Sequence, residues 1–276
     1  MQSILLHLLA ALLYAILGLW FWRATATSGG ERTTTTGMST AERLILLLAL
    51  GVHGLALHAN LFPDGHMRFG FGLAISLMVW LAGCFYWIET FYTRLHGLHV
   101  FVLAAGLIAS LIPALLPGQN IIVNADSPAF RAHFVLSMLA YSLFTLAALH
   151  AMLMKIAERQ LHNGRLSPGI ARLPPLLTME TLLFRIIGIA FVLLTLTVGS
   201  GVVFSEALFG QPFRLDHKTA LTIISWLLFG ILLFGRRVWG WRGRKALRWT
   251  LAGFIVLVLA YVGSRFVLEV LLARGG

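Results

Sequence analysis

The sequence has little charge. Asp, Glu, Lys and Arg together make up 11% of its 276 residues, whereas a soluble domain carries about 25% charged residues. Hydrophobic residues make up 59% of the chain, and its mean hydropathy is +0.87. This composition excludes an ordinary soluble domain and indicates an integral membrane protein.

Cysteine is also scarce. The single cysteine, Cys84, lies within an apolar run, and one thiol can form neither an intrachain disulfide nor a thiolate metal cluster. The sequence likewise lacks a Gly-x-Ser-x-Gly elbow, a Walker loop and a His-Glu-x-x-His pair. These absences do not decide whether the protein is an enzyme, but they favour a non-enzymatic role.

Long apolar runs are what the sequence has instead. A membrane-spanning helix needs about 20 mostly apolar residues. Eight segments approach or exceed that length: 2–22, 44–62, 69–89, 97–116, 131–154, 180–204, 218–234 and 249–271. We therefore predict an all-α polytopic membrane helix bundle that forms a single integral membrane domain. A four-helix N-terminal part would occupy residues 1–120, and a second four-helix part residues 121–276.

The basic residues are distributed unevenly between the two sides of this bundle. Fourteen of the 21 lie in the connections 23–43, 90–96, 155–179 and 235–248, and five lie on the other side. The positive-inside rule then places these connections in the cytoplasm and both termini outside. The net charge of +11 is thus mostly a signal of membrane topology. We expect the lipid bilayer, and no nucleic acid, as a partner.

Ten histidines are many for so apolar a chain, and imidazole is a common ligand of haem iron and of transition metals. His133 lies three residues into the fifth segment and His217 at the outer mouth of the seventh, so both fall at one depth. An iron porphyrin there could take one axial ligand from each. The alternatives are an interfacial polar anchor for His133 and a helix-capping role for His217 beside Asp216.

A second pair of histidines lies deeper. His150 is 17 residues beyond His133 on the same predicted helix, about 25 Å further down. His53 lies near mid-membrane between Gly51 and Gly54, and such small residues let a helix or a flat macrocycle approach closely. We predict an inner site from His53 and His150. The alternatives are an interface histidine for His150 and a cross-helix hydrogen bond for His53.

Four blocks between about residues 128 and 270 resemble the cytochrome c assembly (CcsA/CcmC-type) membrane proteins, and more closely their HemX/YpjD-like branch. The blocks are AHFVLSMLAYSLFTLAALHAML, LLFRIIGIAFVLLTLTVGSGVVFSEALFG, LDHKTALTIISWLLFGILLFGR and LAGFIVLVLAYVG. In haem-handling relatives an external histidine opens the helix that matches His133. Those relatives also carry a Trp-Asp-Pro-Lys-Glu-Thr-Trp-like string where this chain has RLDHKTALTIISW. That string keeps Asp216, Lys218, Thr219 and Trp226.

The chain departs from the relatives in two places. Its loop 205–217 contains no tryptophan, and no histidine follows the last segment. Full cytochrome c synthase activity is therefore not expected. His217 could replace the lost external ligand.

The resemblance implies a haem-binding or haem-handling protein of the bacterial inner membrane, related to cytochrome c biogenesis. The expected cofactor is haem b. Its iron would be held by His133 and His217 at the outer site and by His53 and His150 at the inner site. Haem-delivery or cytochrome assembly proteins are the expected protein partners.

Two other classes of function stay open. One is a small-solute or ion transporter, or its accessory subunit, for which helices broken near mid-membrane would be evidence. The other is a membrane regulator of a soluble partner, acting through the basic loops 155–179 and 235–248.

Overall fold

The computed structural model describes residues 2–27, 38–93, 97–116, 121–122, 125–164, 173–205 and 216–267. Within these residues eight helical segments are long and apolar enough to cross a membrane, which confirms the predicted all-α membrane bundle. The described residues form no strand, and one isolated antiparallel bridge joins Arg68 and Ile121. The helices are α1 (Gln2–Thr27), α2 (Thr40–Leu61), α3 (Phe71–Glu89), α4 (Leu98–Leu115), α5 (Pro128–His162), α7 (Leu176–Val203), α9 (His217–Trp239) and α10 (Gly243–Val258), followed by the π-helical turn η1 (Leu259–Gly263) and α11 (Ser264–Phe266).

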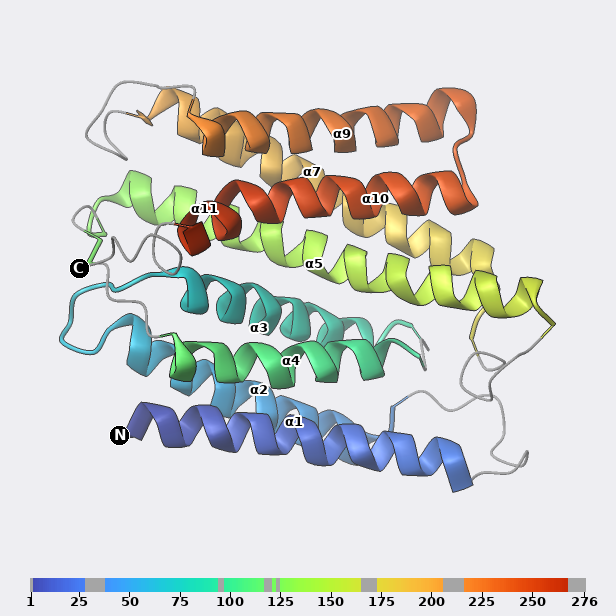
Figure 1. Cartoon of the computed structure of the whole chain (residues 1–276), viewed down its shortest axis with the longest axis horizontal. Helices are drawn as coiled ribbons and strands as arrows, with labels where there is room; N and C mark the ends of the chain where they lie inside the picture. The colour runs from blue at the N-terminus through green and yellow to red at the C-terminus, as the bar shows by residue number, and fades with distance from the viewer. Residues whose placement is uncertain are drawn as a thin grey trace.

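The helices lie side by side with their axes running in the same general direction (Figure 1). Helices α1–α4 form one half of the bundle and α5, α7, α9 and α10 the other, with α3 packed against α5. Helices α1, α3, α5 and α9 all begin at the same end, which the charge distribution predicts to be outside. We call it the predicted outer end, and the opposite one the predicted inner end.

Local sequence explains several helix boundaries. Ser39 and Glu42 form a capping box at the start of α2, in which each side chain accepts a backbone N–H from the other residue. Asp216 caps α9 by accepting a hydrogen bond from the Thr219 N–H at 2.8 Å. Helix α9 ends at Gly240, whose φ of 63° lies in the left-handed region that favours glycine.

Several helices extend beyond the apolar segments that predicted them, and α5 and α10 extend furthest. Helix α5 continues to His162, whereas the apolar stretch stops at residue 154, and α10 begins at Gly243 rather than at 249. The extension of α5 reads KIAERQLH, which is polar but rich in good helix formers. The apolar part of α5, which fits the bilayer, stops at residue 154, but the helix itself continues to His162.

Close ring packing joins the three central helices of the C-terminal half. The rings of Phe144 on α5 and Phe229 on α9 stack with centroids 3.9 Å apart, and both side chains are fully buried. Gly253 on α10 lies directly against the Phe229 ring. This packing fixes α9 and α10 against α5 and so positions the ends of all three helices.

Candidate functional site

His133 is oriented by a hydrogen bond between two helices. It lies in the second turn of α5, and its Nδ1 is 2.9 Å from the Ser200 Oγ on α7. The Ser200 hydroxyl donates its own hydrogen to the Thr197 carbonyl at 3.0 Å, so its oxygen accepts from the His133 Nδ1–H. A neutral His133 then carries its lone pair on Nε2, the nitrogen through which it could ligate a metal.

Four aromatic rings contact one another at the predicted outer end, and we call them the outer aromatic cluster: Phe69, Phe130, Phe134 and Tyr261. Phe130 and Phe134 lie on α5, the helix that carries His133. Phe134 lies 5.0 Å from Phe69 and 6.0 Å from Phe130, centroid to centroid. Phe69 in turn lies 6.1 Å from Tyr261. Phe69 is buried, whereas Phe130, Phe134 and Tyr261 are half-buried, so these three rings present the aromatic surface at this end.

A cation adjoins this cluster. The Lys218 ammonium lies 5.2 Å from the centre of the Tyr261 ring, and its charge also acts on the His133 imidazole. A cation over an aromatic face is attracted by the ring quadrupole. The start of α9 therefore brings positive charge to the place where α5 presents His133.

His217 is exposed at the first position of α9. Asp216, the preceding residue, supplies the helix cap. Desolvation acts to raise the pKa of the Asp216 carboxyl, but hydrogen bonds from Thr219 and the charges of Lys218 and His217 outweigh it, and the pKa lies below its ordinary value. The cap bond joins the Asp216 carboxylate to the Thr219 N–H, so the His217 imidazole takes no part in it. His217 and His133 lie at the same end of the bundle, although no hydrogen bond between them occurs in the described residues.

His53 is fully buried between three helices of the N-terminal half. Its Nδ1 lies 3.2 Å from the Tyr14 hydroxyl on α1, and its Nε2 lies 2.8 Å from the Ser76 hydroxyl on α3. The cross-helix hydrogen bond named above as the alternative for this residue is what the structure contains. Both ring nitrogens are engaged, so iron ligation by His53 would require one of these bonds to break.

A buried histidine that sequence reasoning passed over lies beside His53. His7 on α1 is fully buried, with its ring centroid 6.3 Å from that of His53. Its Nε2 accepts a hydrogen bond from the Asn60 Nδ2 at 2.6 Å. No sequence motif marks His7, because its importance depends on which residues the packing of α1 against α2 brings near it.

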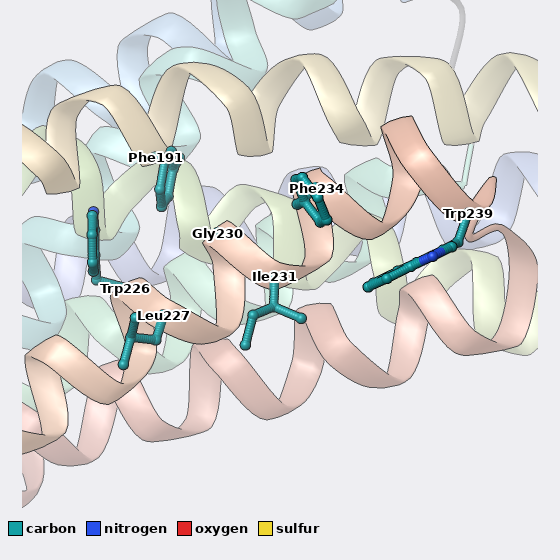
Figure 2. Close-up of a pocket in the computed structure, with 7 residues that line it drawn as sticks. All are labelled: Phe191, Trp226, Leu227, Gly230, Ile231, Phe234 and Trp239. Atoms are coloured by element: carbon teal, nitrogen blue, oxygen red, sulfur yellow. The ribbon is translucent and has the colours of Figure 1, made fainter.

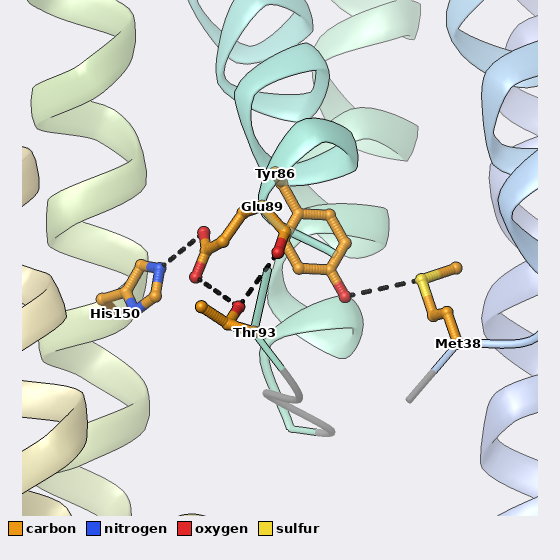
Figure 3. A network of polar contacts seen from close by, with 5 residues as sticks. All are labelled: Met38, Tyr86, Glu89, Thr93 and His150. Carbon is orange, nitrogen blue, oxygen red and sulfur yellow. Dashed lines mark hydrogen bonds and ion pairs between the residues drawn. The ribbon is translucent and has the colours of Figure 1, made fainter. Parts of the chain in front are cut away.

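His150 is paired with a carboxylate. Its Nε2 lies 3.1 Å from the Glu89 Oε2 at the end of α3, and both side chains are buried (Figure 3). The Thr93 hydroxyl donates to the other carboxylate oxygen at 3.3 Å. Glu89 was not predicted to belong to a site. The available signal was its depth, because it ends the third apolar segment on the same side as His150.

The structure does not join His53 to His150. The first is bonded to Tyr14 and Ser76, the second to Glu89, and no hydrogen bond links the two networks within the described part of the chain. Those residues also contain no group of three or more His, Cys, Asp or Glu side chains that could hold a metal ion. The inner site, which pairs His53 with His150, therefore stays a prediction.

The sequence of this bundle matches a known class of membrane protein. The sequence profile of the cytochrome c assembly protein family matches residues 5–272, so the chain belongs to this family. This confirms the resemblance seen in the four C-terminal blocks, and the match also covers most of the N-terminal half.

Particular relatives refine this assignment. The inner membrane protein YpjD of Escherichia coli is 32% identical over 232 residues, which cover 82% of this chain and 85% of the relative. An uncharacterized protein of Azospirillum brasilense is 35% identical over 142 residues, covering 51% of this chain and 52% of the relative. The cytochrome c biogenesis protein CcsA of Rippkaea orientalis is 36% identical over 86 residues, covering 31% of this chain and 25% of the relative. No solved structure matches the chain.

Proposed function

We propose that this protein binds haem at the predicted outer end of the bundle and holds or presents it in the bacterial inner membrane during cytochrome c biogenesis. Family membership supports a role in this process. The observation that carries the proposal is the orientation of His133 by Ser200. A histidine whose Nδ1–H is held by a fixed acceptor is the usual arrangement of a metal ligand, because the second partner sets the tautomer and the ring angle.

The residues around His133 suit a porphyrin. His133 would supply an axial nitrogen through Nε2 and keep its bond to Ser200. The half-buried rings of the outer aromatic cluster, Phe130, Phe134 and Tyr261, would offer apolar surface to the macrocycle. The Lys218 ammonium would offer a counter-charge for a propionate. His217 would provide the second axial nitrogen, and the cap bond of α9, which joins Asp216 to Thr219, leaves its imidazole out.

This protein's own residues would hold and orient the haem rather than attach it. Bound haem b would supply a redox-active iron. The single cysteine, Cys84, lies within α3, and the role proposed is non-enzymatic. Haem-delivery or cytochrome assembly proteins would be the partners that bring the haem or receive it.

The inner pair is a separate proposal. His150 donates its Nε2–H to Glu89, and its buried Nδ1 has no hydrogen-bond partner in the described part of the chain. That nitrogen is the one through which His150 would ligate an iron. His53 as its partner has weaker support, because both of its nitrogens are already bonded.

The test is an absorption spectrum of the detergent-purified protein, oxidised and reduced, after expression with supplied haem. We expect a Soret band and sharp reduced α and β bands in the wild type. The His133→Ala and His217→Ala variants should weaken them. The Ser200→Ala variant should shift the bands rather than abolish them, since it frees the His133 ring to turn. The His58→Ala variant is the control, because His58 is exposed on α2.

Other outcomes would change the assignment. Bands lost only in the His150→Ala or His53→Ala variant would move the haem to the inner site. A spectrum without any Soret band would contradict haem binding altogether. The transporter and regulatory interpretations would then lead.

A further inference from the structure

An apolar groove of about 260 Å³ lies between α7 and α9, on the lipid-facing side of the C-terminal half. Figure 2 shows Phe191 of α7 beside Trp226 of α9, with Phe234 and Trp239 further along α9. Every lining residue is apolar or aromatic. The indole N–H of Trp226, one of the few polar atoms there, already donates to the Thr195 hydroxyl at 2.9 Å. The groove thus suits a hydrocarbon chain rather than a polar solute.

Glycine and stacked rings form the groove. Gly230 lies opposite the Phe191 ring, and a Cβ at that position would be 3.4 Å from the ring. Phe191 also stacks on Trp226 at 5.9 Å, while Phe234 and Trp239 meet edge to face at 5.5 Å further along. Because Gly230 has no side chain, the space between these two aromatic pairs stays open.

The groove is as long as a lipid tail requires. The helical rise between Trp226 and Trp239 is about 20 Å at 1.5 Å per residue. One leaflet of a membrane's hydrocarbon core is about 15 Å thick. Trp239 is 61% exposed at the last position of α9, where an indole fits the membrane–water interface. The groove therefore extends from the interface into the hydrocarbon.

A positive charge continues the same face of α9 beyond the groove. Arg237 follows Gly230 by seven residues and Phe234 by three, a spacing that places all three on one side of a helix. Its side chain is exposed and forms no ion pair with any acidic residue in the described part of the chain. The adjacent Arg236 differs, since it pairs with Glu180 at 3.4 Å and lies over the Phe184 ring.

We propose that the α7–α9 groove binds one acyl chain of an anionic phospholipid whose phosphate lies at Arg237. The apolar lining accounts for the chain, and the unpaired guanidinium accounts for the sign of the head group. A basic residue at the membrane surface attracts anionic lipid strongly enough to favour it about fivefold over a neutral lipid. This site is separate from the proposed haem site, which lies at the opposite end of α9.

The proposal is tested by native mass spectrometry of the purified full-length protein with added phosphatidylglycerol or with phosphatidylcholine of the same acyl chains. Gly230→Leu should fill the groove and remove the bound lipid. Its control is Gly51→Leu, which adds the same side chain to an exposed glycine with open space around it on α2. Arg237→Gln should lower the preference for phosphatidylglycerol about fivefold. Arg248→Gln removes an exposed charge from α10 as its control.

The site is supported if the wild type and both controls retain one phosphatidylglycerol, Gly230→Leu loses it, and Arg237→Gln binds it with the lower preference. Equal binding of the two lipids, or an Arg237→Gln variant with unchanged preference, overturns it. Should Gly230→Leu fail to fold, phosphatidylglycerol with a photoactivatable acyl chain gives a second measurement on the wild type. Crosslinks within the α9 segment 226–239 support the proposal. Crosslinks spread evenly over the exposed faces of the bundle contradict the proposal. Crosslinks that join the groove to a second copy of this chain contradict it too.

Discussion

Several buried polar side chains in this protein meet partners on other helices. His53 bonds to α1 and α3, His150 to α3, and Glu180 on α7 accepts the Gly243 N–H of α10 at 3.1 Å. Within a bilayer there is no water to satisfy a donor or an acceptor, so a missing partner is expensive. Each of these bonds therefore also specifies how two helices are rotated against each other.

The Glu89–His150 pair offers a test at the level of single residues. Glu89→Leu would leave the buried His150 N–H without an acceptor, which costs about 1–3 kcal/mol of unfolding free energy. Glu89→Gln keeps an amide oxygen at the same place and should cost clearly less. Unfolding of the purified variants by sodium dodecyl sulfate in mixed micelles measures the difference.

The control for this experiment is Glu158→Leu. Glu158 pairs with Arg244 at 3.5 Å, and the Arg244 side chain is 67% exposed, so its loss should cost less than about 1 kcal/mol. If the Gln and Leu variants at position 89 were equally stable, the hydrogen bond to His150 would not contribute to folding.

Helices were far easier to predict from the sequence than the partners of their side chains. Apolar length alone located the eight spans found in the described residues. Helices α5 and α9, near whose starts His133 and His217 lie in the sequence, begin at the same end. Rotation about a helix axis is set by packing between distant segments. The sequence therefore did not reveal that Ser200 orients His133, that Glu89 meets His150, or that His7 lies beside His53.

Packing between α5, α9 and α10 gives a prediction at the level of helices. A Cβ on Gly253 would lie 2.9 Å from the Phe229 ring, which is fully buried against Phe144. Gly253→Ala should therefore separate α9 from α10 and cost about 1–3 kcal/mol, the usual penalty of overpacking. Thermal unfolding in detergent measures this cost.

Gly199→Ala is the matched control on α7, because a Cβ there meets nothing within 4 Å. It should be neutral or slightly stabilising, since alanine is the better helix former. Equal melting temperatures for the two variants would mean that the Phe229 ring can move aside without loss.

For the whole molecule, the uneven distribution of charge and the eight spans of the described residues give one expectation. The basic connections belong to the predicted inner end, where α5 ends, and the turn between α2 and α3 belongs to the predicted outer end. The proposed haem site depends on this orientation, because His133 and His217 must then face the periplasm. The proposed lipid site depends on it too, because Arg237 must then face the cytoplasmic leaflet.

Single-cysteine variants decide the orientation. In a Cys84→Ser background, His66→Cys places a thiol in the exposed turn between α2 and α3, and Asn163→Cys places one just beyond α5. A membrane-impermeant maleimide should label the first variant in intact spheroplasts and the second only after the membrane is permeabilised. That result follows from the positive-inside rule, since the cost of moving Arg and Lys outward fixes the bundle in one orientation. Labelling in the reverse order would place His133 and His217 in the cytoplasm, so that any haem they held would be taken up before export rather than after it.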